Sequence, residues 1–376
     1  MKLSKLKLCN YRCFGNDEQT IKIENITSFI GNNSSGKTAA LSALNCLFSE
    51  ISSERVLKRS DFHLPKDTRP ELQESQNMYI EAIFTFDELE EETGEESYAI
   101  PYFSNYLVVD DCEETPYLRI RLEATWQNSN NIEGAIESKI YYITCPEAKD
   151  ITDEDKFVAP RKDLDCIRVI YVPAVRDPSK QLRNVSGTMM YQLMNSINWS
   201  QTIKDKVKGK IQELNNHFLE EKGIEIIASS IRTQWEAYDN DIRYSDAQLR
   251  FNSIDIESAI KKSEVVFSPT ITGKEYGVDD LSDGLRSLFY ISLVDSILDA
   301  EAKIQQQIET EDDVASNYRP PVLTIIALEE PENHIAPHLM GQLVSNLINI
   351  SSKHNAQTIL TSHSTSIIKR VEPEKL

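Results

Sequence analysis

Residues 31–38 read Gly-Asn-Asn-Ser-Ser-Gly-Lys-Thr, a G-x-x-x-x-G-K-T loop between an apolar run at 26–30 and a helix-like run at 39–49. A tight loop needs glycine where φ is positive or where a ligand approaches the backbone closely. The backbone N–H groups of such a loop point inward, and the following helix adds the positive end of its dipole. The stretch therefore predicts a strand, a phosphate-binding loop and a helix.

The side chains of this loop indicate which ligand it takes. Lys37 is expected to reach the β- and γ-phosphates of a nucleotide, and Thr38 to bind Mg²⁺ through its hydroxyl. The alternative is an ordinary strand–turn–helix, but the motif arises by chance in only on the order of one random chain in a hundred. We therefore expect ATP and Mg²⁺ as cofactors. The loop residues expected at the phosphates are Asn32, Asn33, Ser34, Ser35, Gly36, Lys37 and Thr38.

A second motif follows the continuous apolar run 322–328, which is typical of a buried central strand. Glu329 and Glu330 end this run, and side-chain alternation predicts that they face different sides. We expect Glu329 to bind Mg²⁺ and Glu330 to be the catalytic base that orients the attacking water. A glutamate pair at a strand end is often only a solvated terminus. A phosphate loop in the same chain favours the functional interpretation.

Two shorter motifs complete the set. Residues 280–288 read D-L-S-D-G-L-R-S-L, in which Ser282 and Gly284 lie near the start of a predicted helix. A helix cap is the simple interpretation. The functional one needs a second subunit, whose nucleotide would meet the Ser282 hydroxyl and the Gly284 amide. His363 follows the last predicted strand and is a candidate catalytic residue that contacts the γ-phosphate.

The order of these four motifs resembles that of the ABC-type ATPases of the chromosome-maintenance and RecF group, in which two heads sandwich two ATP molecules. Residues 10–14, N-Y-R-C-F, are similar to that group's N-[FY]-R-x-F element, which implies that Arg12 lies near the phosphates. Within the group the chain most resembles the OLD (overcoming lysogenization defect) family, through residues 329–334 (E-E-P-E-N-H), 171–177 (Y-V-P-A-V-R-D) and 281–288 (L-S-D-G-L-R-S-L).

The resemblance implies a homodimer held by a helical arm, with an ATPase that controls a nuclease acting on DNA, often in anti-phage defence. OLD proteins carry a C-terminal Toprim nuclease domain, which needs a Glu after one strand and Asp-x-Asp after another. Here Asp163-Leu164-Asp165 precedes its strand, and residues 153–155 and 239–241 follow no apolar run. No nuclease site is therefore predicted in these residues.

Several alternatives stay open for what the ATPase serves. The favoured one is a Toprim domain in cis, so that this is the ATPase part of a longer protein. A separate effector chain is the second, with this chain as a stand-alone ATP-gated scaffold. A RecF-like DNA-repair ATPase is the third.

The predicted fold class is α/β, an ABC-type P-loop ATPase head with a mixed central sheet, an antiparallel β subdomain and an inserted helical arm. We expect three parts: an ATPase N-lobe at 1–180, a helical dimerisation arm at 181–262 and an ATPase C-lobe at 263–376. The sequence also gives three local predictions of secondary structure. Residues 224–228 and 265–267 are predicted as short strands, residues 304–318 as a polar, mobile segment after a helix at 283–302, and the alternation at 118–123 as an antiparallel sheet with one wet face.

Composition limits the functional classes. The 376-residue chain has a formal net charge of −20, which argues against a broadly basic nucleic-acid surface. No apolar run is long enough to span a bilayer, and the N-terminus lacks the apolar core of a signal peptide. The six cysteines show no C-x-x-C spacing, which is typical of free thiols in a reducing compartment. We expect a cytoplasmic protein with no membrane partner, and DNA as a partner of the full system.

Overall fold

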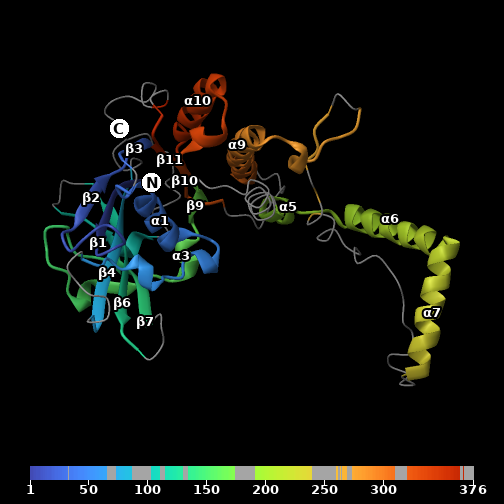
Figure 1. Cartoon of the computed structure of the whole chain (residues 1–376), viewed down its shortest axis with the longest axis horizontal. Helices are drawn as coiled ribbons and strands as arrows, with labels where there is room; N and C mark the ends of the chain where they lie inside the picture. Colours follow the sequence, from blue (N-terminus) through green and yellow to red (C-terminus); the bar gives the residue numbers. More distant parts are fainter. Residues whose placement is uncertain are drawn as a thin grey trace. The chain divides into compact units, whose positions relative to one another are not determined.

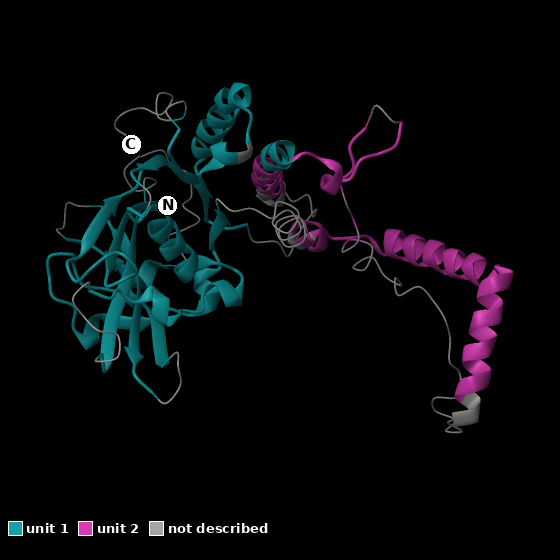
Figure 2. Cartoon of the chain, viewed as in Figure 1, with its two compact units in different colours: residues 1–178, 283–289, 320–376 teal, residues 179–282, 290–319 magenta. Residues whose placement is uncertain are grey.

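The computed structural model describes residues 1–32, 34–65, 73–86, 103–110, 115–129, 134–173, 191–238, 260, 263, 265–268, 273–309, 320–364 and 367. Contacts between Cα atoms divide the chain into two compact units (Figure 2). Unit 1 comprises Met1–Pro178, Asp283–Phe289 and Pro320–Leu376, and unit 2 comprises Ser179–Ser282 and Tyr290–Arg319. The three-part division drawn from the sequence stays a prediction.

A parallel sheet carries the predicted motif strands (Figure 1). Its order is β3 (Ile26–Ile30), β11 (Ala356–Ser362), β10 (Leu323–Glu329) and β9 (Ile167–Val172). Every residue of β10 and β11 is buried. Helix α10 (Met340–Ser351) packs against β11 and β3, while α1 (Lys37–Phe48) contacts β9, β10 and β11. Because the two central strands are covered on both faces, β10 reads as a continuous apolar run without alternation.

An antiparallel sheet forms the second layer of unit 1. Its order is β2-β1-β4-β6-β7-β8, with β5 paired to β6. The strands are β1 (Lys2–Cys9), β2 (Gln19–Lys22), β4 (Ser75–Thr85), β5 (Leu107–Val108), β6 (Tyr117–Gln127), β7 (Ala135–Ile143) and β8 (Lys156–Val158). The predicted α/β class with an antiparallel β subdomain is confirmed. Within the described part of the chain the two sheets are separate, so the central sheet is parallel and not mixed.

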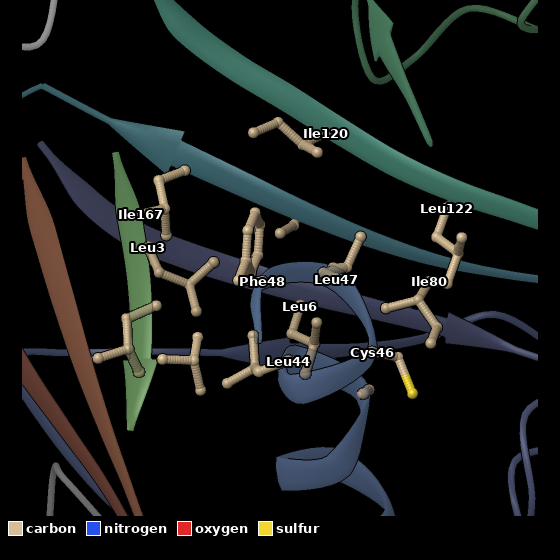
Figure 3. Packing of buried hydrophobic residues seen from close by; sticks show 14 of the residues in the cluster. Leu3, Leu6, Leu44, Cys46, Leu47, Phe48, Ile80, Ile120, Leu122 and Ile167 are labelled. Carbon is tan, nitrogen blue, oxygen red and sulfur yellow. The ribbon is translucent and has the colours of Figure 1, made fainter. Parts of the chain in front are cut away.

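Helix α1 forms the core between the two sheets. Its residues from Ala39 to Phe48 are all buried, and most of them are apolar, as expected for a helix that is covered all round. The two polar ones are hydrogen-bonded, Ser42 to Tyr11 and Asn45 to Glu54. Figure 3 shows Leu44, Leu47 and Phe48 of this helix beside Leu3, Leu6, Ile80, Ile120, Leu122 and Ile167. The N-terminus of α1, where the phosphate loop ends, is therefore fixed by packing.

Gln357 joins the two sheets through hydrogen bonds. Its Oε1 accepts from the backbone N–H of Leu3 at 2.7 Å, and its Nε2 donates to the carbonyls of Leu3 at 3.1 Å and Glu24 at 3.2 Å. The residue is 1% exposed. A buried amide that pairs with both backbone groups of Leu3 is fully hydrogen-bonded, and it holds β11 of one sheet against β1 of the other.

The structure differs from the sequence-based expectations in three further segments. Helix α7 (Lys222–Tyr238) contains residues 224–228, so the predicted strand there is wrong. Local isoleucines favour a strand, but the longer helical window decides the outcome. Residues 265–267 form no named strand, and Phe267 makes an isolated bridge with Tyr276. Helix α9 (Asp283–Glu309) continues past residue 304, and residues 310–318 lie outside the described ranges.

The other described helices are short, apart from α6. They are α3 (Arg161–Leu164), α5 (Tyr191–Ser196), α6 (Gln201–Glu220), and the 3-10 helices η1 (Ser52–Glu54), η2 (Arg59–Asp61), η5 (Ser104–Tyr106), η6 (Asp153–Asp155), η8 (Val278–Asp280), η9 (Pro331–His334) and η10 (Pro337–Leu339). No helix in the described ranges is both long and apolar enough to cross a membrane.

The antiparallel sheet buries charges where the alternation predicted a wet face. Arg119 Nε donates to Glu81 Oε1 at 2.8 Å, and Arg121 donates through NH1 to Glu81 Oε2 at 2.9 Å. Arg119 also donates to the carbonyl of Cys145 at 2.6 Å. Glu81 and Arg119 are 0% and 2% exposed, so the wet-face prediction is wrong at Arg119. Arg121 and Glu123 are half-buried and alternate with buried neighbours, and the antiparallel pairing that the alternation predicted is confirmed. Charged and apolar residues alternate there, and the charged side chains pair with charges on the neighbouring strand.

We expect Glu81→Gln to lower the free energy of unfolding by about 3 kcal/mol, because breaking a buried ion pair leaves an uncompensated charge. Two arginines lose their carboxylate at once. Chemical unfolding measures the change. Asp153→Asn is the matched control, since Asp153 is fully exposed and lies 4.0 Å from Lys156 on the same sheet. If both variants unfold at the wild-type midpoint, the buried pair contributes nothing to stability.

Candidate nucleotide-binding site

The four parallel strands bring the predicted site residues to one edge of the sheet. Ile30 is level with Ser362, Thr361 with Glu329, and Leu328 with Val172. The carboxyl ends of parallel strands form the usual ligand crevice of such sheets. The phosphate loop, the two glutamates and His363 therefore begin at the same edge of unit 1.

The two glycines of the phosphate loop are required by close contacts. Gly36 caps α1 with φ of 102°, a left-handed conformation that side chains rarely adopt. A Cβ atom on Gly36 would lie 3.0 Å from both Cys13 Sγ and Phe14 Cζ. A Cβ atom on Gly31 would lie 2.7 Å from Ser35 Oγ. The loop therefore packs tightly on itself and on the segment around Phe14.

Lys37 is held over the loop by the loop's own backbone. Its Nζ donates to the carbonyls of Gly31 at 2.8 Å and Asn32 at 2.9 Å. It is the first residue of α1, and Thr38, the second, is exposed. Asn32, Ser34 and Ser35 are exposed as well, while Asn33 lies outside the described residues. An ammonium group above exposed loop residues at a helix N-terminus fits an anionic ligand.

Arg12 lies beside the phosphate loop and is anchored by Asp61. Arg12 Nε donates to Asp61 Oδ1 at 2.9 Å, and the Arg12 backbone N–H donates to the Asp61 carbonyl at 2.8 Å. Burial disfavours the charged guanidinium, but Tyr11 and Asp61 outweigh it, and the pKa of Arg12 is raised. Its neighbours Cys13 and Phe14 face Gly36. The residues next to Arg12 thus pack against the loop, and the place of Arg12 near the phosphates stays a prediction.

Glu329 ends β10 as a buried carboxylate, 5% exposed. Tyr171 on the neighbouring strand β9 hydrogen-bonds to it, and burial together with this carboxylate raises the pKa of Tyr171. The Thr38 hydroxyl and the Glu329 carboxylate are both oxygen donors, which Mg²⁺ prefers. In proteins Mg²⁺ is usually bound by one or two carboxylates together with the phosphates of the substrate. The residues present therefore fit this metal.

Glu330 leaves the strand in a left-handed turn, with φ of 41°. Its Oε1 lies 3.3 Å from His363 Nε2, and its Oε2 accepts from Asn333 Nδ2 at 2.8 Å. Its backbone N–H donates to the carbonyl of Thr361 at 2.9 Å. The different directions of Glu329 and Glu330 thus involve this turn and not strand alternation alone. The structure brings the two predicted catalytic residues together.

Backbone strain is concentrated at this site. The non-glycine residues with positive φ among those described are Asn10, Arg12, Ser34 and Glu330. Each such conformation costs on the order of 1 kcal/mol or more, and it persists where the surrounding structure enforces it. All four belong to segments assigned to the site from sequence alone, so this is an independent sign of function.

Four further residues of the site were given no role by the sequence, although three of them lie in the quoted motifs at 171–177 and 329–334. Asp61 holds Arg12, Tyr171 contacts Glu329, and Asn333 contacts Glu330. The fourth is Glu332, which binds the turn after β11. Asp61, Tyr171 and Glu332 meet partners that lie far away in the chain, so spacing within a motif could not identify these contacts. Asn333 lies only three residues from its partner Glu330.

Gly284 lies in the first turn of helix α9 and Ser282 just before it, as predicted. The helix begins at Asp283, and Ser282 directly precedes it. Ser282 and Leu285 are exposed. Ser282 belongs to unit 2, whereas the phosphate loop belongs to unit 1. Their role toward a nucleotide stays a prediction.

Comparison with known proteins gives one family and a set of distant structures. The family model described as AAA ATPase domain matches residues 1–368. An SMC head bound to the C-winged helix domain of ScpA is 14% identical over 99% of this chain and 93% of that chain, with a TM-score of 0.46. The SMC head domain from Thermotoga maritima has the same identity and coverage, with a TM-score of 0.38.

A third structure is an Smc head domain with an extended coiled coil, bound to the C-terminal domain of ScpA derived from Pyrococcus furiosus. It is 13% identical over 98% of this chain and 91% of that chain, with a TM-score of 0.46. No curated protein matches the chain.

Proposed function

The chain belongs to the AAA ATPase domain family, and on that premise we propose that it is an ABC-type ATPase that binds ATP with Mg²⁺ and hydrolyses it. The observation that carries the proposal is the Glu330–His363 pair, 3.3 Å apart at the sheet edge where the phosphate loop begins. A carboxylate held by two side chains beside a phosphate site suits a base for water.

Binding follows from the loop. The N–H groups at the start of α1 and the Lys37 ammonium receive the phosphates, with Arg12 as a second cation beside them. Thr38 and Glu329 would hold the metal, which would supply positive charge to offset that of the phosphates. Tyr171 and Asp61 keep Glu329 and Arg12 in place.

Hydrolysis follows from Glu330. Its carboxylate accepts a proton from water while the water oxygen forms a bond to the γ-phosphorus. The bond from that phosphorus to the bridging oxygen breaks, and ADP leaves with the electron pair. The proton then passes from Glu330 to phosphate or solvent. Asn333 and His363 hold the carboxylate during this step.

Phosphate release by the purified chain tests the function. We expect release that requires both ATP and Mg²⁺ and stops when EDTA removes the metal. Nucleotide binding without phosphate release would overturn hydrolysis and leave only a nucleotide-gated scaffold.

We propose that the helical arm pairs with a second copy of the chain. Helix α7 exposes Ile227, Ile231 and Trp235, which repeat every four residues and so share one face. Exposed apolar side chains of this size on one helix face are typical of an interaction site. The 281–288 motif supports a dimer too, since its functional interpretation needs a partner's nucleotide.

The double variant Ile227→Glu/Ile231→Glu is expected to shift the protein from dimer to monomer at micromolar concentration, because two charges would be buried in the interface. Light scattering gives the mass. Thr233→Glu adds one charge to another face of α7 and should leave the dimer intact. A monomeric wild type, or a dimer in the double variant, would contradict the arm's role.

We further propose, from the OLD-like motifs at 329–334 and 281–288, that ATP turnover controls a Toprim nuclease in cis or a separate effector chain, acting on DNA in anti-phage defence in the cytoplasm. The mass of the native product in its host tests this. A product larger by a domain supports the cis arrangement, and a co-purifying nuclease supports the separate one. Salt-sensitive, ATP-dependent DNA binding by this chain alone would instead favour a RecF-like role.

A further inference from the structure

Glu332 uses one carboxylate oxygen to bind the whole turn that follows β11. Its Oε1 accepts from Ser362 Oγ at 2.7 Å, from the backbone N–H of His363 at 2.8 Å and from that of Ser364 at 3.0 Å. Hydrogen bonds to an ionised carboxylate are about twice as strong as neutral ones. Three of them converge on the residues immediately around His363.

The second oxygen of Glu332 is buried and has no hydrogen-bond partner in the described part of the protein. Leaving a buried polar atom unsatisfied costs on the order of 1–3 kcal/mol. The arrangement therefore gives up part of the stabilisation that a fully bonded carboxylate would provide. What it secures is the conformation of residues 362–364.

That conformation sets the distance between the two predicted catalytic side chains. Glu330 is tied to β11 through its backbone N–H and the Thr361 carbonyl, 2.9 Å apart. Glu332, in η9, binds residues 362–364 at the end of β11 and just after it. Between these two ties lies the 3.3 Å contact of Glu330 Oε1 with His363 Nε2.

We propose that Glu332 is a positioning residue for ATP hydrolysis, which holds the turn after β11 so that His363 meets Glu330. This inference rests on the proposed ATPase function. Glu332 reaches the reaction only through His363 and Glu330. A neutral amide at this position keeps an acceptor oxygen but loses the charge that supports three donors.

The first test compares Glu332→Ala and Glu332→Gln with wild type. Displacing a catalytic group by about 1 Å costs on the order of 10²-fold in rate. We expect kcat to fall about 100-fold in Glu332→Ala and by an intermediate factor in Glu332→Gln, with KM and the Kd for a fluorescent ATP analogue within about twofold of wild type. Thermal unfolding checks the fold, and Glu332→Gln carries the test if the alanine variant does not fold.

Glu147→Gln is the matched control. Glu147 is a part-buried carboxylate that binds Lys5 at 2.6 Å and Lys7 at 2.9 Å on the antiparallel sheet. Its loss is expected to lower stability and leave kcat unchanged. Comparing Glu147→Gln with the Glu332 variants therefore distinguishes a general loss of stability from a loss of positioning at the site.

A double-mutant cycle decides whether Glu332 acts through His363. In a His363→Ala background, Glu332→Ala should reduce kcat by less than about threefold, because residues that act through one contact are not additive. An equal loss in both backgrounds, or an unchanged kcat in a folded Glu332→Ala protein, overturns the inference. If wild type hydrolyses ATP and Glu330→Gln does not, such a result leaves the proposed function standing. If wild type itself releases no phosphate, the proposed function fails, and this inference with it.

Discussion

Glu330→Gln is expected to lower kcat for ATP hydrolysis by about 10³-fold while the Kd for ATP stays within about threefold of wild type. The amide has the size of the carboxylate, and its oxygen can still accept from Asn333. What it loses is the ability to accept a proton from water. Binding relies on other groups, the loop amides and Lys37, so it should persist.

Phosphate release and equilibrium binding, measured on the same preparation, separate the two effects. Glu74→Gln is the matched control, because Glu74 is an exposed glutamate just before β4. It should hydrolyse ATP like wild type. Normal turnover in Glu330→Gln would remove Glu330 from the reaction, and a parallel loss of binding would point to a collapsed loop.

Lys37→Ala is expected to weaken ATP binding about 100-fold, since charged hydrogen bonds contribute about 1.5–3 kcal/mol and each 1.4 kcal/mol is a factor of ten. The side chain serves the site twice. It supplies the cation nearest the phosphates, and it holds the carbonyls of Gly31 and Asn32, so that the loop keeps its shape.

Titration with a fluorescent nucleotide measures this loss. Lys22→Ala removes an exposed lysine from β2 and should bind ATP like wild type. The deficit of Lys37→Ala should also shrink as salt rises, because screening weakens the charge contribution in the wild type. Equal affinity in Lys37→Ala and wild type would exclude the loop as the phosphate site.

The parts of the site that sequence could predict are those with local signals. Gly31 and Gly36 predict the loop because Gly36 has a positive φ and a Cβ atom on Gly31 would meet the Ser35 hydroxyl. The unbroken apolar run of β10 predicts a strand covered on both faces, and the carboxylates that end it are therefore expected at the sheet edge. Such features depend on a few consecutive residues.

What sequence missed depends on partners distant in the chain. Glu332 meets Ser362 and Asp61 meets Arg12 across the fold, and no spacing rule encodes either contact. Burial of Glu81 was hidden in the same way, because its arginine partners lie on another strand. The strand predicted at 224–228 failed for the opposite reason, since a short window of isoleucines outweighed the longer helical context.

The pairing of β3 with β11 sets the order in which the parts of the site are synthesised and can assemble. In synthesis from the N-terminus, the phosphate loop is made before β4 to β10, yet β11, the strand beside β3 in the sheet, is made after them. Gln357 meets Leu3 across 354 residues, an interval of on the order of tens of seconds at ribosomal speed. A nascent chain therefore carries the loop long before it has the sheet edge that completes the site. ATP that binds as proposed can stabilise this unit only after translation has passed β11, because binding stabilises the folded site and not the unfolded chain.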